Sequence, residues 1–576
     1  MERTLRDADV VVVGAGLGGL TTAAYLAVLG RRVVVVDRHS VAGGNATVFR
    51  HRGFEFDVGV HYLGDCGPGG SIPGVLEPLG VTLEFAEMDP DGFDTFVFPD
   101  QVLEIPKGVD VFRERLHETF PSEREGVDTY LDAIVAVDRA LLGGGPSEPL
   151  TAHAGSTLGG VFDDLGLSPR LRSLLGGQHG TYALPPSRAS FVLHAVLAMH
   201  YLKGAYYPVG GGQVIADALA DVIRGHGGEI VLRTPVERIV VEEGAARGVR
   251  LRPPSPERRR GVPEEIRAPV VVSNADLKRT VLELVGPEHF PSETVEAVRG
   301  YRMALPLFVE YLVIDRDLRT EGHPNTNVYV VSDDDVEGQY GTLEAGRLPD
   351  PPMAYMTFAS LKDPTNPRLC RPGQTNLQVM TLVPAAHRYW GVGGGPAAGE
   401  RYRRNREYAA RKREVADRLL ATAERGLPGL RDAIVFEESA TPITHERFVR
   451  STGGTSYGIE CSPDQFLFHR PAPTTPVRGL FLCGASTMGA HGIAGVMGGG
   501  VMTASAVAGH RSGSWRASAS PRPGADPATG PAGQVAGVPG GRRSRRRTHG
   551  RSPGRPRPGR GGSRVRADSI TSWRCT

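Results

Sequence analysis

Three glycines, Gly14, Gly16 and Gly19, follow a run of four valines with the spacing of a dinucleotide-binding loop. In such a loop the first glycine permits a tight turn, the second lets the backbone approach a pyrophosphate, and the third allows close packing of the next helix. The amino end of that helix stabilises the anion. Asp37 stands 23 positions after Gly14, where a carboxylate can accept hydrogen bonds from a ribose 2′-hydroxyl. These residues predict a site for an adenosine dinucleotide without a 2′-phosphate.

A second glycine-rich turn bears on which dinucleotide is bound, because the first loop alone does not separate NAD from FAD. Gly43 and Gly44 lie between Arg38 and Asn45, just past the first strand, helix and strand. At this place the longer flavin dinucleotide still has a pyrophosphate and a ribityl chain to accommodate. The second turn therefore favours FAD.

The segment 479–510, near the other end of the chain, again combines a strand, a glycine-rich loop and the start of a helix. Cys483 and Gly484 end a short apolar strand, and a glycine-rich loop leads to a helix that we expect to start near residues 494–496. The positive end of this helix can point at the flavin O2 and stabilise the anionic reduced ring. The alternative for this cluster is ordinary packing of a terminal helix.

The elements that position these residues follow from apolar runs. Residues 10–13 and 33–36 are uninterrupted valines, which is typical of parallel strands covered on both faces. Residues 17–29 between them have a helical pattern, and Gly30 ends it. The sequence therefore begins with a β-strand, an α-helix and a second parallel strand.

Further elements are expected along the middle of the chain. Residues 108–142 and 158–202 have helical patterns. A small antiparallel unit should follow, made of residues 230–233, 236–241 and 248–251, with residues 253–267 as its charged loop and residues 270–273 as a buried strand after it.

Residues 300–470 mix strands with one long helix. In that helix Tyr408, Val415, Leu419 and Ala423 recur on one face, and Gly426 stands at its end. We find no internal repeat.

In their order along the chain, these motifs resemble the phytoene desaturase, carotenoid isomerase and retinol saturase family of FAD-dependent oxidoreductases. The resemblance spans nearly all of residues 7–510, and the GVHYLG segment is more similar to the retinol saturases and carotenoid isomerases. The segments that carry it are DADVVVVGAGLGGL, GGNATVF, FEFDVGVHYLGD, YYPVGGGQVIADALA, GGEIVLRTPVERIVVEEGAARGVRL, VVVSNAD and GLFLCGAST with HGIAGVMGGG.

The resemblance implies an α/β fold with a Rossmann-like FAD-binding domain that is discontinuous in sequence and a mixed α+β substrate-binding domain. Composition adds a disordered basic carboxyl-terminal tail. We expect the FAD-binding domain at 1–65, 205–280 and 471–510, the substrate-binding domain at 66–204 and 281–470, and the tail at 511–576.

The resemblance also implies which residues hold the cofactor, with the glycine loop on the pyrophosphate, Asp37 on the ribose and the Val236 backbone on the adenine. The full expected set is Gly14, Ala15, Gly16, Gly18, Gly19, Asp37, Arg38, Gly43, Gly44, Asn45, Val236, Gly484, Gly492, Ala494, Gly495, Val496 and Met497. Asn45 stands where amine oxidases have an arginine, and Ala485 where many flavoproteins have an acid. Both departures argue against an amine oxidase.

Catalytic residues follow less directly, because the flavin itself performs hydride transfer and the protein supplies positioning and a dry pocket. His61, Tyr62 and His491 lie near the expected flavin and are our candidates for assisting a proton transfer. His194 and His200 lie in an apolar run that either lines a tunnel for a lipid-like substrate or forms a core helix.

The composition limits which partners and which cellular location we expect for the protein. Residues 511–576 carry a formal net charge of +13 with few core-forming residues, and the remaining chain carries −11. A tail of this kind can touch an anionic surface, or it is a solvated extension; we expect no nucleic-acid partner. The five cysteines form no paired motif, so no metal site is expected. With neither a signal sequence nor a membrane span in view, we expect a cytoplasmic protein, soluble or peripheral to a membrane.

Together these observations predict a flavoenzyme that desaturates, saturates or isomerises carbon–carbon double bonds of an apolar isoprenoid such as a carotenoid or retinoid. One alternative is an FAD-dependent amine or porphyrinogen oxidase. Another, from a different class, is a flavin-less escort protein on the same scaffold, against which Gly14, Gly16, Gly19 and Asp37 argue. The sequence assigns no reaction direction, electron partner or oligomeric state.

Overall fold

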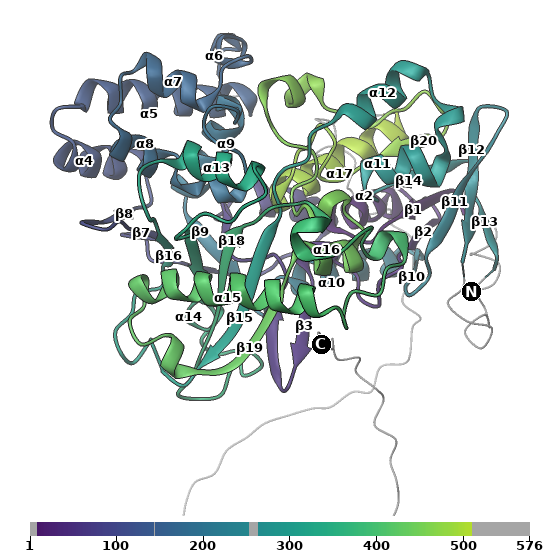
Figure 1. The fold of residues 1–576 in the computed structure, drawn as a ribbon. Helices are drawn as coiled ribbons and strands as arrows, with labels where there is room; N and C mark the ends of the chain where they lie inside the picture. The colour runs from purple at the N-terminus through teal and green to yellow at the C-terminus, as the bar shows by residue number, and fades with distance from the viewer. Residues whose placement is uncertain (1–7, 143–144, 253–262, 510–576) are drawn as a thin grey trace, which may run out of the picture.

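The computed structural model of the chain describes residues 8–142, 145–252 and 263–509. Two large sheets lie beside each other, and a group of helices extends from one end (Figure 1). The tail predicted at 511–576 lies outside the described residues, so its disorder stays a prediction.

The first sheet is parallel and has five strands in the order β10-β2-β1-β14-β20. Every valine of its two central strands is buried, as the uninterrupted apolar runs predict. The helix between them, α2, spans Leu17–Val28. The strands are β1 (Val10–Val13), β2 (Val33–Val36), β10 (Glu229–Val231), β14 (Val270–Ser273) and β20 (Leu480–Leu482).

Both faces of the parallel sheet are covered, which is why β1 and β2 are apolar throughout. On one face Val10 and Val12 pack against the helices α2, α10 and α17. On the other, Val11 and Val13 pack against a three-stranded antiparallel sheet and α12. These covering elements are α10 (Gln213–Gly225), α17 (Gly492–Ala508), β11 (Val236–Glu242), β12 (Ala245–Leu251), β13 (Glu265–Arg267) and α12 (Ser292–Gly300).

The prediction that residues 230–233 join the antiparallel unit is wrong. Ile230 lies in β10 and is paired in parallel with Val35 of β2. A short apolar run specifies a strand but not its partner, and here α10 returns the chain to the edge of the parallel sheet. The third antiparallel strand is instead β13, from the segment predicted as a charged loop; residues 253–262 of that segment lie outside the described residues.

The second sheet has seven strands in the order β19-β15-β18-β17-β16-β7-β8. The long helix α15 (Arg406–Gly426) packs on one face, and its predicted apolar side is buried. The opposite face turns toward the parallel sheet. The strands are β7 (Asp94–Val97), β8 (Val102–Ile105), β15 (Leu307–Ile314), β16 (Asn327–Val330), β17 (Ala354–Thr357), β18 (Thr375–Leu382) and β19 (Ile434–Ala440).

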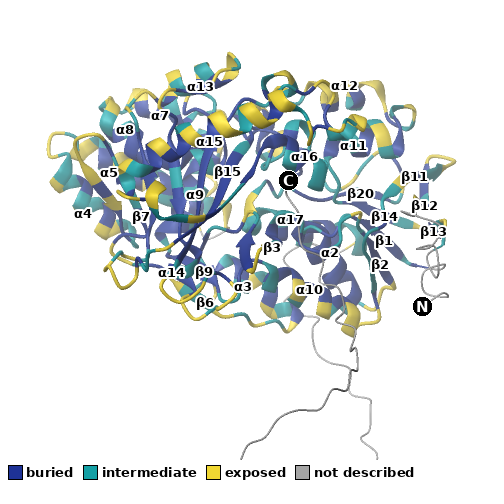
Figure 2. Cartoon of the chain, turned by 60° about the horizontal axis from the view of Figure 1, so that its bottom comes forward, coloured by how far each residue is buried: buried dark blue, intermediate teal, exposed yellow. Residues whose placement is uncertain are grey.

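The helices that extend from this sheet form their own apolar core. Figure 2 shows the strands of both sheets as buried and the outward faces of the surrounding helices as exposed. The predicted domain boundaries stay a prediction. The remaining elements are α3 (Ser71–Leu76), α4 (Val109–Thr119), α5 (Arg124–Leu141), α6 (Glu148–His153), α7 (Leu158–Asp164), α8 (Pro169–Leu175), α9 (Phe191–Leu202), α11 (Leu277–Arg279), α13 (Val336–Glu344), α14 (Ala359–Lys362), α16 (Pro442–Val449), β3 (Val48–His51), β4 (Phe54–Asp57), β5 (Leu63–Gly64), β6 (Phe85–Glu87) and β9 (Ala205–Pro208).

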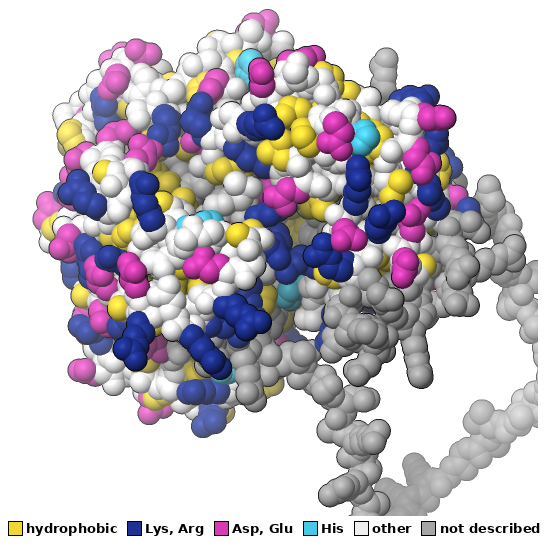
Figure 3. All heavy atoms as spheres, turned by 45° about the vertical axis from the view of Figure 1, so that its right-hand side comes forward, with side chains coloured by type: hydrophobic (Ala, Val, Ile, Leu, Met, Phe, Trp, Pro, Cys, Tyr) yellow, Lys and Arg dark blue, Asp and Glu magenta, His cyan; other side chains and the backbone are white. Residues whose placement is uncertain are grey.

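The surface mixes charges of both signs. On the face drawn in Figure 3, basic and acidic side chains of the described residues are interspersed, with hydrophobic side chains between them. Among the helices of the described ranges, none combines the length and the apolar character needed to cross a membrane.

Candidate functional site

A cavity of about 1480 Å³ lies between the carboxyl ends of the parallel strands and the inner face of the second sheet. Ligand pockets commonly measure about 300–1,000 Å³, so this one has room for a dinucleotide together with a second ligand. Ligands of open α/β sheets bind outside the carboxyl ends of the strands, which is where this cavity begins.

The glycine loop after β1 forms the start of the cavity wall. Gly14 has φ +102°, a conformation that side chains other than glycine rarely adopt. A Cβ on Gly19 would lie 2.3 Å from the Gly14 carbonyl oxygen, and one on Gly16 would lie 2.9 Å from Asn274 Nδ2. The turn thus requires Gly14 and the close packing of α2 requires Gly19, while the pyrophosphate contact expected for Gly16 stays a prediction.

Asp37 lies at the carboxyl end of β2 and lines the cavity. Its Oδ2 accepts the Ala15 N–H at 2.7 Å and its Oδ1 accepts the His39 N–H at 2.6 Å. The carboxylate therefore fastens the glycine loop and keeps lone pairs toward the cavity. Because the Ala15 amide donates to Asp37, Ala15 stabilises the loop and does not line the cavity.

The second glycine turn lies directly against the first. Gly43 has φ +127°, and its N–H donates to the Ala15 carbonyl at 2.7 Å. A Cβ on Gly44 would lie 3.0 Å from the Gly16 Cα. Asn45 lines the same wall, and its Oδ1 is buried with no hydrogen-bond partner among the described residues. The two turns form a cradle of glycine backbone, and the Asp37 carboxylate and the unsatisfied Asn45 amide oxygen lie on the same wall.

The loop after β20 closes the cradle from the other side. Gly484 has φ +104°, and a Cβ on it would lie 2.8 Å from Asn274 Oδ1. The following helix, α17, begins at Gly492 with His491 as its N-cap, which is slightly earlier than predicted. Its first turn lines the cavity, so the positive end of the helix faces the ligand space.

Most predicted cofactor-binding residues lie on this wall, and Ala15, Gly19 and Met497 do not. Gly19 packs α2 against the loop, and Met497 is buried in the core between the sheet and its helices, because α17 turns it away from the cavity. Those that line the cavity are Gly14, Gly16, Gly18, Asp37, Arg38, Gly43, Gly44, Asn45, Val236, Gly484, Gly492, Ala494, Gly495 and Val496.

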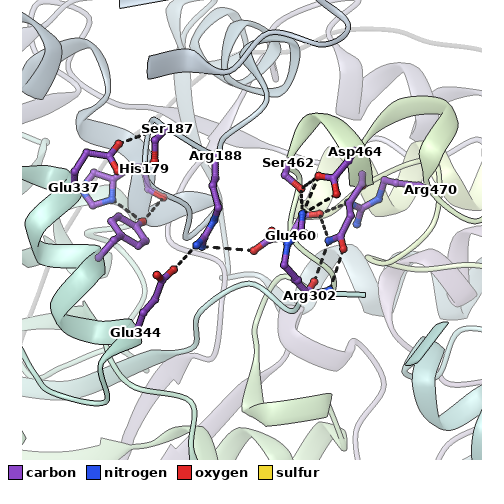
Figure 4. Close-up of polar contacts among 12 residues, drawn as sticks. His179, Ser187, Arg188, Arg302, Glu337, Glu344, Glu460, Ser462, Asp464 and Arg470 are labelled. Carbon is purple, nitrogen blue, oxygen red and sulfur yellow. Dashed lines mark hydrogen bonds and ion pairs between the residues drawn. The ribbon is translucent and has the colours of Figure 1, made fainter. Parts of the chain in front are cut away.

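Arg470 is a buried residue that sequence reasoning missed. Its guanidinium donates to the carbonyls of Ala485 at 2.6 Å and Thr487 at 3.0 Å, which fixes the loop after β20. It also donates to Cys461 Sγ at 3.0 Å. Figure 4 shows it beside the buried Glu460. No spacing marks Arg470 in the sequence, because its partners are chiefly backbone carbonyls.

Glu460 joins this loop region to the rest of the molecule. Its carboxylate pairs with Arg302 at 2.5 Å and with Arg188 at 3.6 Å (Figure 4). Arg302 also binds Asp464, so the segment 459–465 is held on both sides. The segment that carries Glu460 is therefore fixed by ion pairs in which the Glu460 carboxylate is buried and the arginines reach the surface.

The three predicted catalytic residues all line the cavity. Burial lowers the pKa of His61 and of His491 to about 3, so both rings are neutral near pH 7. The Nδ1 of His491 lies 3.4 Å from Cys461 Sγ, and the Nδ1 of His61 is buried without a hydrogen-bond partner among the described residues. The Tyr62 hydroxyl donates to Asp94 at 3.0 Å.

The two histidines of α9 have different places. His194 is buried in the core, where its Nε2 lies 2.6 Å from the Tyr130 hydroxyl, so it belongs to a core helix. His200 lines the cavity and accepts the Gly64 N–H at 2.9 Å. The same helix therefore contributes both to the core and to the cavity wall.

The far part of the cavity is mostly apolar. It is faced by a wall of four tyrosines: Tyr62 before β5, Tyr201 on α9, and Tyr329 and Tyr355 on the second sheet. Toward the surface it is lined by leucines of α5, α6 and α9, and by Phe468. Leu142 is 65% exposed and Phe468 is 81% exposed, which is unusual for side chains of this size. We call Leu141, Leu142, Leu150 and Phe468 the apolar rim.

The residues present fit a flavin dinucleotide. The glycine cradle admits a pyrophosphate, Asp37 can accept from a ribose, and the Asn45 amide oxygen has no partner in the part of the chain that the structure describes. The start of α17 offers a positive helix end where the ring system would lie. Among the described residues no group of histidine, cysteine and acidic side chains could hold a metal ion.

Comparison with known proteins places the chain in a family. A profile of the family described as flavin-containing amine oxidoreductase matches residues 17–369. All-trans-retinol 13,14-reductase of Danio rerio is 26% identical over 546 residues, covering 88% of this chain and 86% of that protein. Prolycopene isomerase 2, chloroplastic, of an Oncidium hybrid cultivar is 27% identical over 531 residues, covering 87% and 84%.

A solved oxidoreductase from Methanosarcina mazei shares the fold, with a TM-score of 0.59 at 18% identity over 87% of this chain and 99% of that one. The predicted α/β fold of this type is confirmed. Because the profile matches more than half of the residues, the chain belongs to the flavin-containing amine oxidoreductase family, with retinol reductases and prolycopene isomerases as distant relatives.

Proposed function

We propose that the protein binds FAD and acts on carbon–carbon double bonds of an apolar isoprenoid, such as a carotenoid or retinoid, by desaturation, saturation or isomerisation. The observation that carries this proposal is the continuity of one cavity from the glycine cradle to the tyrosine wall and the apolar rim. A long apolar ligand can enter such a cavity and reach the ring end of a dinucleotide. The names of the full-length relatives support the same class of substrate.

Bound FAD supplies the transfer of a hydride and its electron pair. The chain's own residues hold the dinucleotide, orient the apolar ligand against it and exclude water, because the wall opposite the cradle is aromatic and aliphatic. His61 and His491 are neutral and can accept a proton only weakly. Tyr62 is the cavity-lining candidate whose hydroxyl is hydrogen bonded to a titratable partner.

A visible spectrum of the purified protein tests the cofactor, since flavin bands are expected and a flavin-less escort protein has none. Anaerobic incubation with a panel of carotenoids and retinoids then tests the substrate, with flavin redox state and product mass read together. Turnover of amines or porphyrinogens, with no change in any polyene, would overturn the isoprenoid proposal in favour of the oxidase alternative.

We also propose that the apolar rim docks on a lipid surface, from which a water-insoluble substrate could enter. Leu142 and Phe468 are the most exposed members of the rim, and both line the cavity. A cytoplasmic location and peripheral membrane contact are part of this proposal. Cell fractionation followed by flotation with liposomes tests it.

A further inference from the structure

Behind the tyrosine wall lies a group of buried polar residues that the proposed function does not use. Asp94 is the first residue of β7, and Lys362 is the last residue of α14. Asp94 is fully buried and Lys362 is 2% exposed, and neither lines the cavity. Burying two charged groups in a core is costly unless they are paired or serve a purpose.

Asp94 accepts hydrogen bonds from three side chains. Its Oδ2 accepts from the Tyr62 hydroxyl at 3.0 Å and from Gln178 Nε2 at 2.7 Å. Its Oδ1 accepts from Asn327 Nδ2 at 2.9 Å. These donors come from distant parts of the sequence, so the cluster exists only in the folded chain.

Lys362 reaches the same cluster from the other side. Its Nζ donates to Asn327 Oδ1 at 2.6 Å, to the His61 carbonyl at 3.0 Å and to Thr357 Oγ1. It also lies 5.9 Å from the centroid of the Tyr62 ring. Asn327 therefore bridges the carboxylate and the ammonium, and the positive charge acts on both Asp94 and Tyr62.

Tyr62 connects the cluster with the cavity. One face of its ring stacks on Tyr201, with centroids 4.2 Å apart, and the residue lines the cavity. Its hydroxyl lies 3.2 Å from the hydroxyl of Tyr329, another wall residue. The hydroxyl also accepts from Gln178 Nε2 at 3.3 Å. Because the Tyr62 side chain contacts both the cavity and Asp94, a proton lost from its hydroxyl can be replaced from Asp94.

The environment brings the proton affinities of the two charged groups close together. Burial raises the pKa of Asp94 to about 6 and lowers the pKa of Lys362 to about 7. Burial also raises the pKa of Tyr62 well above its usual value. The other titratable groups that act on these three are His61, Asp57 on β4, and the tyrosines Tyr201, Tyr329 and Tyr355.

We propose that Tyr62 exchanges a proton with the ligand in the cavity, and that Asp94 and Lys362 are positioning residues that hold and replace this proton. The inference depends on the proposed function, because addition or removal of hydrogen across a double bond needs a proton as well as a hydride.

In the direction that adds hydrogen, the O–H bond of Tyr62 breaks and a C–H bond forms at one substrate carbon. The hydride on the other carbon derives, by way of the flavin chemistry, from an external two-electron hydride donor. A proton on Asp94 Oδ2 then passes to the Tyr62 oxygen, and the Lys362 ammonium balances the carboxylate that remains. In the direction that removes hydrogen, the same atoms take the proton and an external two-electron acceptor takes the hydride.

The test compares Asp94→Asn with Asp57→Asn in the FAD-loaded protein. Asp57 is an equally buried carboxyl that also acts on Lys362 and accepts from a tyrosine, Tyr207, but that tyrosine does not line the cavity. In the wild type, kcat should change as pH rises through about 6. It should fall in the direction that adds hydrogen to the substrate and rise in the direction that removes hydrogen. This change is one limb of the pH profile of kcat. Asp94→Asn should abolish the limb, and Asp57→Asn should keep it.

Two further variants address Tyr62 and Lys362. Tyr62→Phe should lower kcat by about 100- to 10,000-fold with little change in KM or in the flavin spectrum, because it removes only the exchangeable proton. Lys362→Met should move the limb to higher pH, since the ammonium holds the pKa of Asp94 down. An unchanged limb in Asp94→Asn, or its equal loss in Asp57→Asn, overturns the inference.

An infrared titration separates this inference from the proposed function. One infrared band of a protonated carboxyl should be present in the wild type and absent from Asp94→Asn. In protein without substrate, this band should fade as pH rises through about 6. A missing band shows that Asp94 holds no proton and overturns the inference. If the band is present and no isoprenoid is turned over, it is the proposed function that fails.

Discussion

Replacement of Asp37 by alanine should weaken FAD binding while the fold stays intact. A hydrogen bond to a charged group contributes about 1.5–3 kcal/mol, which corresponds to a factor of roughly 10–150 in Kd for the ribose contact. The variant also removes the acceptor of the Ala15 and His39 amides, so the loop loses its fastening. The sheet itself depends on buried valines and should keep its stability.

The assay is titration of the flavin-free protein with FAD, followed by fluorescence, with flavin content after dialysis as a second reading. Asp9→Ala is the matched control, because Asp9 binds the Arg32 backbone at 2.8 Å between the same two strands and does not line the cavity. Circular dichroism checks that both variants fold. A Kd for Asp37→Ala within about twofold of the control would refute the assigned role of this carboxylate.

Three further predictions concern the body of the protein and its surface. Burial raises the pKa of Glu310 to about 8, above the ordinary 4.5. As pH rises between these two values, the free energy of unfolding should therefore fall by roughly 1.4 kcal/mol per pH unit. Urea melts of Glu310→Gln at pH 5 and pH 8 should no longer show this difference. Arg470→Met should release bound flavin faster than wild type in stopped-flow dilution, since the loop after β20 loses its buried donor; an unchanged rate contradicts this. Replacing Leu142 and Phe468 by serine should reduce liposome flotation in high salt, and deleting residues 511–576 should remove only a salt-sensitive part and leave flavin binding intact.

The glycine cradle and the parallel sheet could be predicted from the sequence, because their constraints are local. A turn with positive φ requires glycine at a fixed position, and a strand covered on both faces must be apolar at every residue. Gly14, Gly16 and Asp37 therefore pointed to residues that do line the cavity, and their contacts to a dinucleotide stay a prediction. The partner of β10 was predicted wrongly, since strand pairing depends on the path of the chain through α10.

The cluster behind the tyrosine wall gave only a weak signal. Asp94 interrupts an apolar stretch that ends in three aromatic or aliphatic residues. Lys362 is the last residue of a short helix that follows a strand, and the two residues have no recognisable spacing. Their proximity arises where β7, β16 and α14 meet, and Asn327 joins them only there. The apolar rim could not be predicted from the sequence either, because the exposure of a side chain is a property of the folded surface.

The sequence by itself determined the dinucleotide loop, its carboxylate and the apolar strands, because glycine conformation and side-chain periodicity act between neighbours in the chain. The tertiary structure alone decided that His194 belongs to the core and His200 to the cavity, although both lie on α9. It also decided that Met497 faces the core and that Arg470 holds the loop after β20. The physical reason is that burial, hydrogen-bond partners and shifted pKa values depend on which distant segments pack together, and no local pattern specifies that packing.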